Sequence, residues 1–199
     1  VRNFSDVQKK ELLTPGTGAG ADSEIMPLVF NSLAGTKFKV VKGYKGTAEA
    51  SLAVERGELD GIAYWSWSSI ISAHPDWIRD KKINLLFQTG TKEIPGVPGV
   101  PRIRELISNP IDRRALEFLL AREVIGRPFL LPPGVPDDRV KFLREAFAET
   151  MKDPAFIKDA ETGNIEVNLV TGEEVDALLK DAATSPPQVI ERVKKILDR

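Results

Sequence analysis

The sequence contains no cysteine, a single histidine and no long apolar run, and each absence excludes a class of function. Without cysteine the chain forms no disulfide and has no thiolate nucleophile or thiolate ligand for zinc. One histidine, His74, gives no spacing that indicates a metal site. No apolar stretch approaches the roughly 20 residues that a membrane-spanning helix needs. The net charge of −1 and the scattered basic residues predict no nucleic-acid partner.

The first 88 residues alternate between strand-like and helix-like segments, which favours a parallel sheet covered by helices. Strands are predicted at 10–14, 37–41, 59–65 and 82–88. Helices are predicted from Ser23, with Pro27 in the first turn and a stop at Gly35, and from Thr47 to Arg56, closed by Gly57. We expect residues 1–88 to form one α/β lobe.

Proline and glycine crowd residues 93–101, where we place a lobe boundary or crossover. Beyond it the pattern predicts a helix at 112–126, a short buried strand at 127–133 and a clear helix within 135–153. A capping-box pattern starts a further helix at Thr171, and the last helix follows Pro187. Residues 89–199 are expected to form the crossover and part of a second lobe.

The glycine-rich stretch Gly16-Thr17-Gly18-Ala19-Gly20-Ala21 satisfies one form of the dinucleotide-binding fingerprint. That reading needs an acidic residue at the end of the next strand, but the sequence there is Val41-Lys42-Gly43-Tyr44. Two other interpretations stay open. Backbone amides and the following helix start can hold a phosphate or a carboxylate, or the glycines serve only a tight turn.

Asp22 has two roles open to it. As the N-cap of the following helix it satisfies free amides, which is the interpretation we favour. Turned into a site, its carboxylate would attract an amine and repel a carboxylate. A second loop, 43–50, repeats the order of strand, glycine, tyrosine, glycine and helix, and the strand at 59–65 delivers Tyr64 and Trp65 to the same sheet edge.

Enzymatic patterns are weak in this chain. No G-x-S-x-G nucleophile elbow exists, and the single histidine lies in the turn-like sequence SAHPDW. We therefore predict no catalytic residue, no metal and no cofactor.

Several segments resemble the substrate receptors of tripartite tricarboxylate transporters, the TctC/Bug-type periplasmic binding proteins. The resembling stretches are VRNFSDVQKKELL, FKVVKGYKGTAEASLAVERGELDG, IPGVPGVPRIREL and FLLPPGVPDDRVKFLREAFAETMKDPAFIKDA. They follow one another in the order of the family and cover nearly the whole chain. The segment 127–160 is the most specific.

The resemblance implies an α/β fold like that of type II periplasmic binding proteins, with a parallel-sheet lobe carrying helices on both faces and part of a second α/β lobe. It implies a receptor, not an enzyme, that binds a small organic carboxylate and delivers it to membrane permease subunits. The implied ligand-binding residues are Thr17, Gly18, Ala19, Gly20, Ala21, Asp22, Ser23, Tyr44, Lys45, Gly46, Tyr64 and Trp65. The implied location is the periplasm, with the leader not present in this chain.

Two departures from the family modify these expectations. Asp22 and Glu24 add charge to a loop that usually has little, which argues against a plain dicarboxylate or tricarboxylate ligand and leaves open a carboxylate that also carries an amine, such as an amino acid. The family's first hundred or so residues have no counterpart, so we expect apolar surface to be exposed and to promote self-association. The alternatives are a small α/β enzyme that binds an NADP-type nucleotide, and a truncated interaction domain that binds no small molecule.

Overall fold

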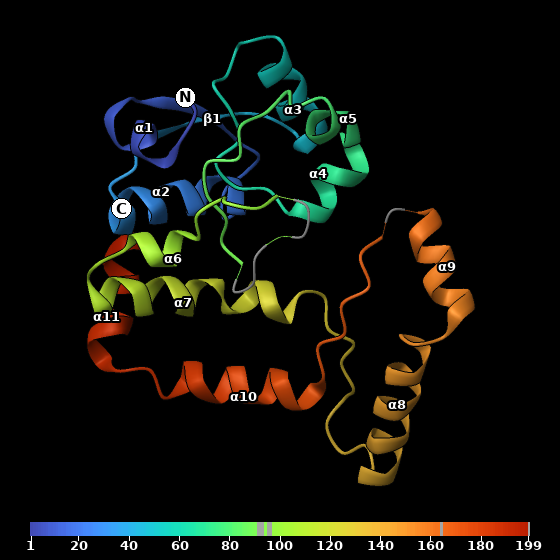
Figure 1. Cartoon of the computed structure of the whole chain (residues 1–199). Helices are drawn as coiled ribbons and strands as arrows, with labels where there is room; N and C mark the ends of the chain where they lie inside the picture. Colours follow the sequence, from blue (N-terminus) through green and yellow to red (C-terminus); the bar gives the residue numbers. More distant parts are fainter. Residues whose placement is uncertain (91–93, 95–96, 164, 199) are drawn as a thin grey trace. The chain divides into compact units, whose positions relative to one another are not determined.

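The computed structural model describes residues 1–90, 94, 97–163 and 165–198. The chain forms two compact units (Figure 1). Unit 1 comprises Val1–Ser66, Asp76–Glu117 and Pro186–Arg199, and unit 2 comprises Trp67–Pro75 and Phe118–Ser185. The expected division into residues 1–88 and 89–199 stays a prediction. The expected boundary at 93–101 lies partly outside the described residues.

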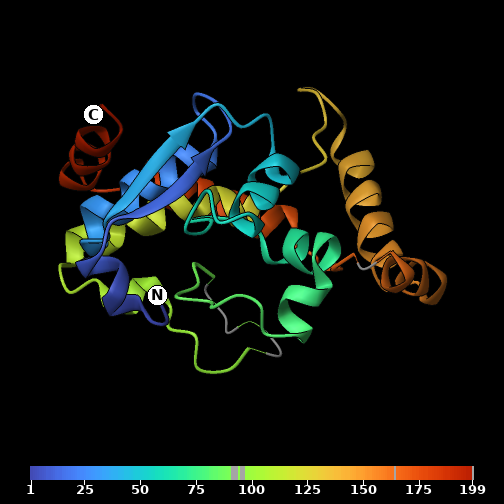
Figure 2. The same cartoon turned by 90° about the horizontal axis from the view of Figure 1, so that it is seen from above.

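Unit 1 is built on two parallel strands, β1 (Leu12–Gly16) and β2 (Phe38–Lys42), which lie side by side in Figure 2. In their register Leu12 lies opposite Phe38, and Gly16 lies opposite Lys42. Helix α2 (Asp22–Ala34) connects them and packs against both strands. Both strands occur within two residues of their predicted positions. The general α/β class is confirmed.

Helix α2 ends as the sequence predicts. Gly35 follows it in the left-handed conformation at φ 67°, which a glycine adopts without steric cost. Pro27 is the exception. It lies buried beyond the first turn, where its missing amide leaves the Ser23 carbonyl without the usual helical donor. The expectation that Pro27 falls within the first turn is therefore wrong.

The remaining helices of unit 1 surround this strand–helix–strand motif. They are α1 (Phe4–Lys9), α3 (Thr47–Glu55), α5 (Pro75–Arg79), α6 (Ile103–Leu106), the first half of α7 (Pro110–Ile125) and α11 (Pro187–Leu197). The buried apolar side chains of unit 1 include Val7, Met26, Phe30, Ile103, Leu116 and Ile196. The predicted helices at 47–56 and 112–126 are confirmed within two residues.

The predicted third strand is wrong: 59–65 lies along β1 without forming a ladder. The Asp60 amide donates to the Leu13 carbonyl at 3.0 Å, but the Leu13 amide donates to the Asp60 carboxylate at 2.8 Å. Further along, the Ala63 amide donates to the Thr14 hydroxyl at 2.9 Å. Successive strand residues point their backbone groups to alternate sides, so Pro15 faces this segment as Leu13 does. Because proline has no amide, the ladder stops there.

The predicted fourth strand at 82–88 is also wrong. Its only strand-like pairing among the described residues is an isolated parallel bridge between Gln88 and Arg102. The apolar pattern of the segment instead supplies a core contact. The ring of Phe87 packs edge-on against Phe30 at 5.0 Å and against Phe4 at 5.7 Å between ring centroids.

Unit 2 is helical, with α4 (Trp67–Ala73), the second half of α7, α8 (Asp137–Thr150), α9 (Pro154–Thr162) and α10 (Gly172–Ala183). Thr171 caps α10 with the predicted capping box: its hydroxyl accepts from the Glu174 amide, and the Glu174 carboxylate accepts from the Thr171 amide. Pro136 is the N-cap of α8, one position earlier than the sequence indicated.

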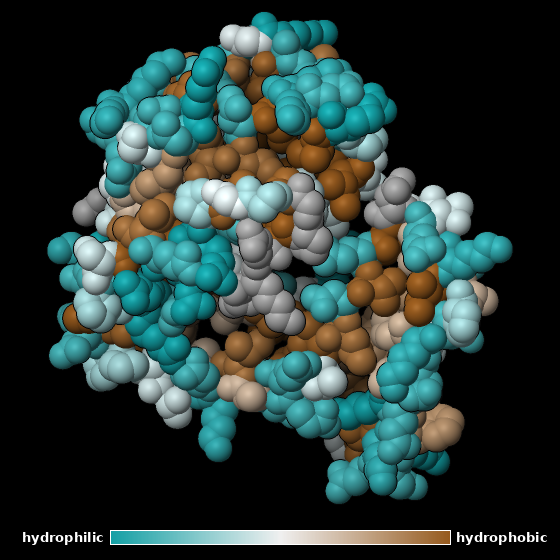
Figure 3. All heavy atoms as spheres, viewed as in Figure 1, coloured by the Kyte–Doolittle hydropathy of each residue, from teal (hydrophilic) through white to brown (hydrophobic). Residues whose placement is uncertain are grey.

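The predicted buried strand at 127–133 is wrong. Phe129 is 86% exposed and Leu130 82% exposed, and no strand lies beside them in the part of the chain that the structure describes. Pro128, Pro132 and Pro133 remove three of the amides that a ladder would need. Figure 3 shows apolar side chains at the molecular surface, among hydrophilic ones.

Candidate functional site

Two helix starts meet at the carboxyl edge of the β1–β2 pair. The register aligns the ends of the two strands, and the Tyr44 amide donates to the Gly16 carbonyl at 3.3 Å. The loop before α2 and the loop before α3 therefore begin beside each other, within unit 1. The predicted binding segments Thr17–Ser23 and Tyr44–Gly46 both leave this edge. In open α/β sheets this edge is the usual place for ligands.

The first loop is held closed by its own hydroxyl groups. The Thr17 amide donates to the Ser23 hydroxyl at 3.0 Å, and the two hydroxyl oxygens lie 2.8 Å apart. Gly18 and Gly20 have φ values of 141° and 80°, and no atom lies within 4 Å of a Cβ added at either position. The backbone conformation, not crowding, is what requires glycine at these two positions.

Glu24 occupies the inside of this loop. The residue is only 8% exposed, its Oε1 accepts from the Gly18 amide at 3.2 Å, and its Oε2 lies 3.4 Å from Nζ of the exposed Lys42. A carboxylate of the protein itself thus binds one of the loop amides predicted to hold a ligand anion. Sequence reasoning noted the charge of Glu24 but not this position. Its place as the third residue of the helix, typical of a capping glutamate, was the available signal.

Unlike Gly18 and Gly20, Gly16 is required because neighbouring side chains pack closely against it. A Cβ there would lie 2.7 Å from Cγ1 of Val40, 2.8 Å from Cγ of Glu24 and 2.9 Å from its Oε1. The Glu24 side chain therefore passes directly over the end of β1, which only glycine allows.

The second loop has the same internal arrangement. Gly46 is the N-cap of α3, and Glu49, the third residue of that helix, accepts a hydrogen bond from the Lys45 amide at 2.7 Å. Each of the two helix starts at this edge therefore carries a glutamate that folds back onto its own loop. Lys42 and Lys45 are exposed beside these carboxylates.

The favoured role of Asp22 as an N-cap is wrong. Ala21 is the N-cap, with extended backbone angles and no side-chain cap, and Asp22 is the first residue inside α2. Glu24 and Ser23 bond the loop from within the helix instead, so the loop closes without a capping side chain at position 21.

Tyr64 and Trp65 lie half-buried among aromatic side chains. The Tyr64 ring contacts Phe30 at 6.3 Å between centroids, and the Trp65 ring packs edge-on against Trp77 at 6.1 Å. The Trp77 indole donates to Glu55 at 3.0 Å. Tyr64 and Trp65 thus pack against different aromatic partners. Their part in ligand binding stays a prediction.

Charged residues elsewhere in unit 1 pair with one another. Lys82 donates to Asp76 at 2.6 Å, and this hydrogen bond lowers the pKa of the Asp76 carboxyl below its ordinary value. A bond from Arg79 lowers the pKa of Asp80 in the same way. Among the described residues, no three histidine, aspartate or glutamate side chains gather as metal ligands would.

No known protein-family profile and no curated protein matches the chain. None of the helices that the structure describes combines the length and apolar character needed to cross a membrane.

Proposed function

We propose that this chain is a solute-binding receptor of the kind that serves tripartite tricarboxylate transporters, with a fold like that of type II periplasmic binding proteins. Its ligand is a small organic carboxylate that also carries an amine. The receptor binds this ligand in the periplasm and delivers it to the permease subunits in the membrane. The observation that supports this proposal best is the junction of the Tyr44 amide with the Gly16 carbonyl, which brings two helix starts to one sheet edge.

The charges at this edge favour a ligand with both signs. Lys45 and Lys42, which also pairs with Glu24 at 3.4 Å, supply cations for a carboxylate, and Asp22 supplies an anion for an amine. A plain dicarboxylate would meet the Glu24 and Glu49 carboxylates, which already accept from loop amides. The same carboxylates argue against the pyrophosphate of NADP, because a phosphate would need the Gly18 amide that Glu24 holds.

A thermal-shift screen of the 199-residue chain tests the proposal. The panel contains amino acids, dicarboxylates, tricarboxylates and NADP at millimolar concentration. A ligand at 100 times its Kd stabilises the folded state by about 2.7 kcal/mol, which raises Tm by several degrees. We expect such a shift with one or more amino acids. A shift with NADP alone would favour the nucleotide-binding enzyme, and no shift with any compound would favour an interaction domain.

Glycine substitutions locate the site once a ligand is found. Gly18→Val and Gly20→Val force a β-branched residue into a left-handed conformation and rearrange the loop, so we expect calorimetric binding to be lost in both. Gly134→Val is the matched control, because Gly134 has φ 84° and an open surrounding but lies in unit 2. Unchanged affinity in both loop variants would contradict the proposed site.

A further inference from the structure

Helix α8 of unit 2 has one face that contacts the rest of the unit. Arg144 pairs with Glu173 and Asp176 of α10, at 2.6 and 3.4 Å between side-chain atoms. The ring of Phe147 packs against Phe129 at 5.3 Å between centroids. Residues three and four apart share a helix face, so these contacts fix which side of α8 faces the unit.

The opposite face of α8 carries Arg139, Phe142, Ala146 and Glu149, all exposed. Phe142 is 68% exposed, and among the described residues neither the Phe142 ring nor the Arg139 side chain makes a hydrogen bond, ion pair or ring contact. The face is divided along its length. Its first half carries the basic Arg139 and the aromatic Phe142, flanked by Asp138. Its second half carries the small Ala146 and the acidic Glu149, which also pairs with Lys152 at 2.9 Å between side-chain atoms.

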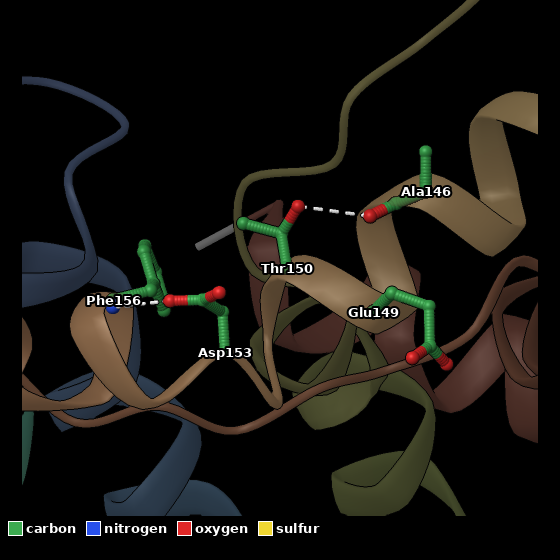
Figure 4. A pocket seen from close by; sticks show the side chains of 5 residues that line it. All are labelled: Ala146, Glu149, Thr150, Asp153 and Phe156. Carbon is green, nitrogen blue, oxygen red and sulfur yellow. Dashed lines mark hydrogen bonds between the residues drawn. The ribbon is translucent and has the colours of Figure 1, made fainter.

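A pocket opens on the second half of this face, between the last turn of α8 and the first turn of α9. Ala146, Glu149, Thr150, Asp153 and Phe156 line it (Figure 4). It is an open depression lined mainly by exposed residues, with a volume of about 360 Å³, against the roughly 150 Å³ of an enclosed cavity that holds a benzene ring. An aromatic side chain therefore fits this pocket, and the acidic residues at its rim favour a basic neighbour beside that ring.

The aromatic and charged residues of this face are placed symmetrically about position 144 of α8. Phe142 and Ala146 are equally far from position 144 along the helix, and so are Arg139 and Glu149. In an antiparallel pair of α8 helices related by a two-fold axis at position 144, Phe142 of each copy faces the Ala146 pocket of the other. Arg139 of each copy then faces Glu149 of the other, as an isologous interface requires.

We propose that two copies of this chain associate through α8 in this antiparallel register. Phe142 of one copy enters the pocket of the other, and two Arg139–Glu149 ion pairs flank the rings. A contact formed mainly by one helix is smaller than a standard interface, so we expect a weak dimer with a Kd on the order of 100 µM. The second copy fits because the charges of this face match those of its own two-fold image.

Sedimentation velocity of the full chain from 10 µM to 1 mM tests this association. We expect a shift from monomer to dimer across this range. Phe142→Ser should weaken the dimer at least about tenfold, and circular dichroism should show an unchanged fold because the side chain is exposed. A monomer at every concentration, or an unchanged dimer with Phe142→Ser, would overturn the proposal.

Charge reversal tests the register. Arg139→Glu alone and Glu149→Arg alone each place like charges opposite one another, so both variants should stay monomeric. Mixing the two restores an opposite pair at both contacts, so the equimolar mixture should dimerise. Lys141→Glu makes the same charge change on another side of α8 and should dimerise normally. Failure of the mixture to dimerise, or equal loss with Lys141→Glu, would exclude this register.

Discussion

Gly16 shows at the scale of one residue why the start of α2 lies where it does. The chain has to pass from β1 into a helix whose third residue folds its side chain back over the strand end. A hydrogen atom at position 16 leaves room for the Glu24 side chain, and a methyl group does not. The glycines at 18 and 20 serve a different need, because they allow the positive φ values of the loop.

We predict that Gly16→Ala destabilises the protein by about 1–3 kcal/mol, the usual range for forcing a methyl group into a packed site. Urea unfolding followed by circular dichroism measures the change. Gly61→Ala is the control, since no atom lies within 4 Å of a Cβ at Gly61 and its φ is not positive, and it should change stability by less than about 0.5 kcal/mol. Equal stability of both variants would contradict the crowding at Gly16.

The site residues were only partly predictable from sequence, and Glu24 shows why. Glycines and a following helix start indicate available amides, but the sequence does not show which amides the protein itself satisfies. The pattern that makes Glu174 a capping residue of α10 is visible in the sequence because Thr171 precedes it by three positions. Glu24 and Glu49 hold the same helix position, but their helices have no threonine or serine N-cap. The sequence pattern therefore does not predict that these carboxylates accept hydrogen bonds from loop amides.

At the scale of elements, helices were predicted better than strands. Gly35, Gly57 and Thr171 are local signals, and a helix satisfies its backbone within its own segment. A strand depends on a neighbour that the local sequence does not name. The apolar runs at 59–65, 82–88 and 127–133 fit a strand, yet none has a partner ladder in the described structure.

One partly buried arginine links helix α11 to two other helices of unit 1. Arg192 donates to the Asp112 carboxylate of α7 at 2.6 Å and to the Ser32 carbonyl of α2 at 3.0 Å, and both charged side chains are less than a quarter exposed. Its neighbours Val189, Val193 and Ile196 are buried. A single side chain thus links three helices that lie far apart in the sequence.

We predict that Arg192→Met destabilises the protein by about 2 kcal/mol, because it leaves the mostly buried Asp112 carboxylate and the Ser32 carbonyl without their donor. The measurement is chemical unfolding at neutral pH. Lys39→Met is the matched control, since Lys39 pairs among the described residues with the exposed Glu11 at 3.4 Å, and its loss should cost less than about 1 kcal/mol. A larger loss in the control would show that exposed pairs matter more here than burial.

At the scale of the whole molecule, apolar burial is divided unequally between the two units. The buried hydrophobic residues of unit 2, among those described, are Ile70, Leu120 and Ala160, and α8 has none. Unit 1 holds the larger buried side chains, such as Phe30 and Met26. Regions with few buried apolar contacts open at lower free energy than a core does.

Native-state hydrogen exchange should therefore find two levels of protection. We expect the amides of β1 and the centre of α2 to exchange only on global unfolding, and those of α8 and α9 to exchange faster by at least about tenfold. The measurement belongs at about 10 µM, below the expected dissociation constant of the α8 dimer. Uniform protection across both units would show that they unfold together despite their unequal cores.

Pro15 also affects whether another chain can add a strand to the β1–β2 sheet. A two-stranded sheet exposes edges onto which a foreign strand could add, and such addition is the usual beginning of aggregation. On the outer side of β1 the Asp60 carboxylate accepts from the Leu13 amide, the Thr14 hydroxyl accepts from the Ala63 amide, and proline removes the next donor. The residue that prevented a third strand from forming thus also protects this edge from intermolecular strand addition.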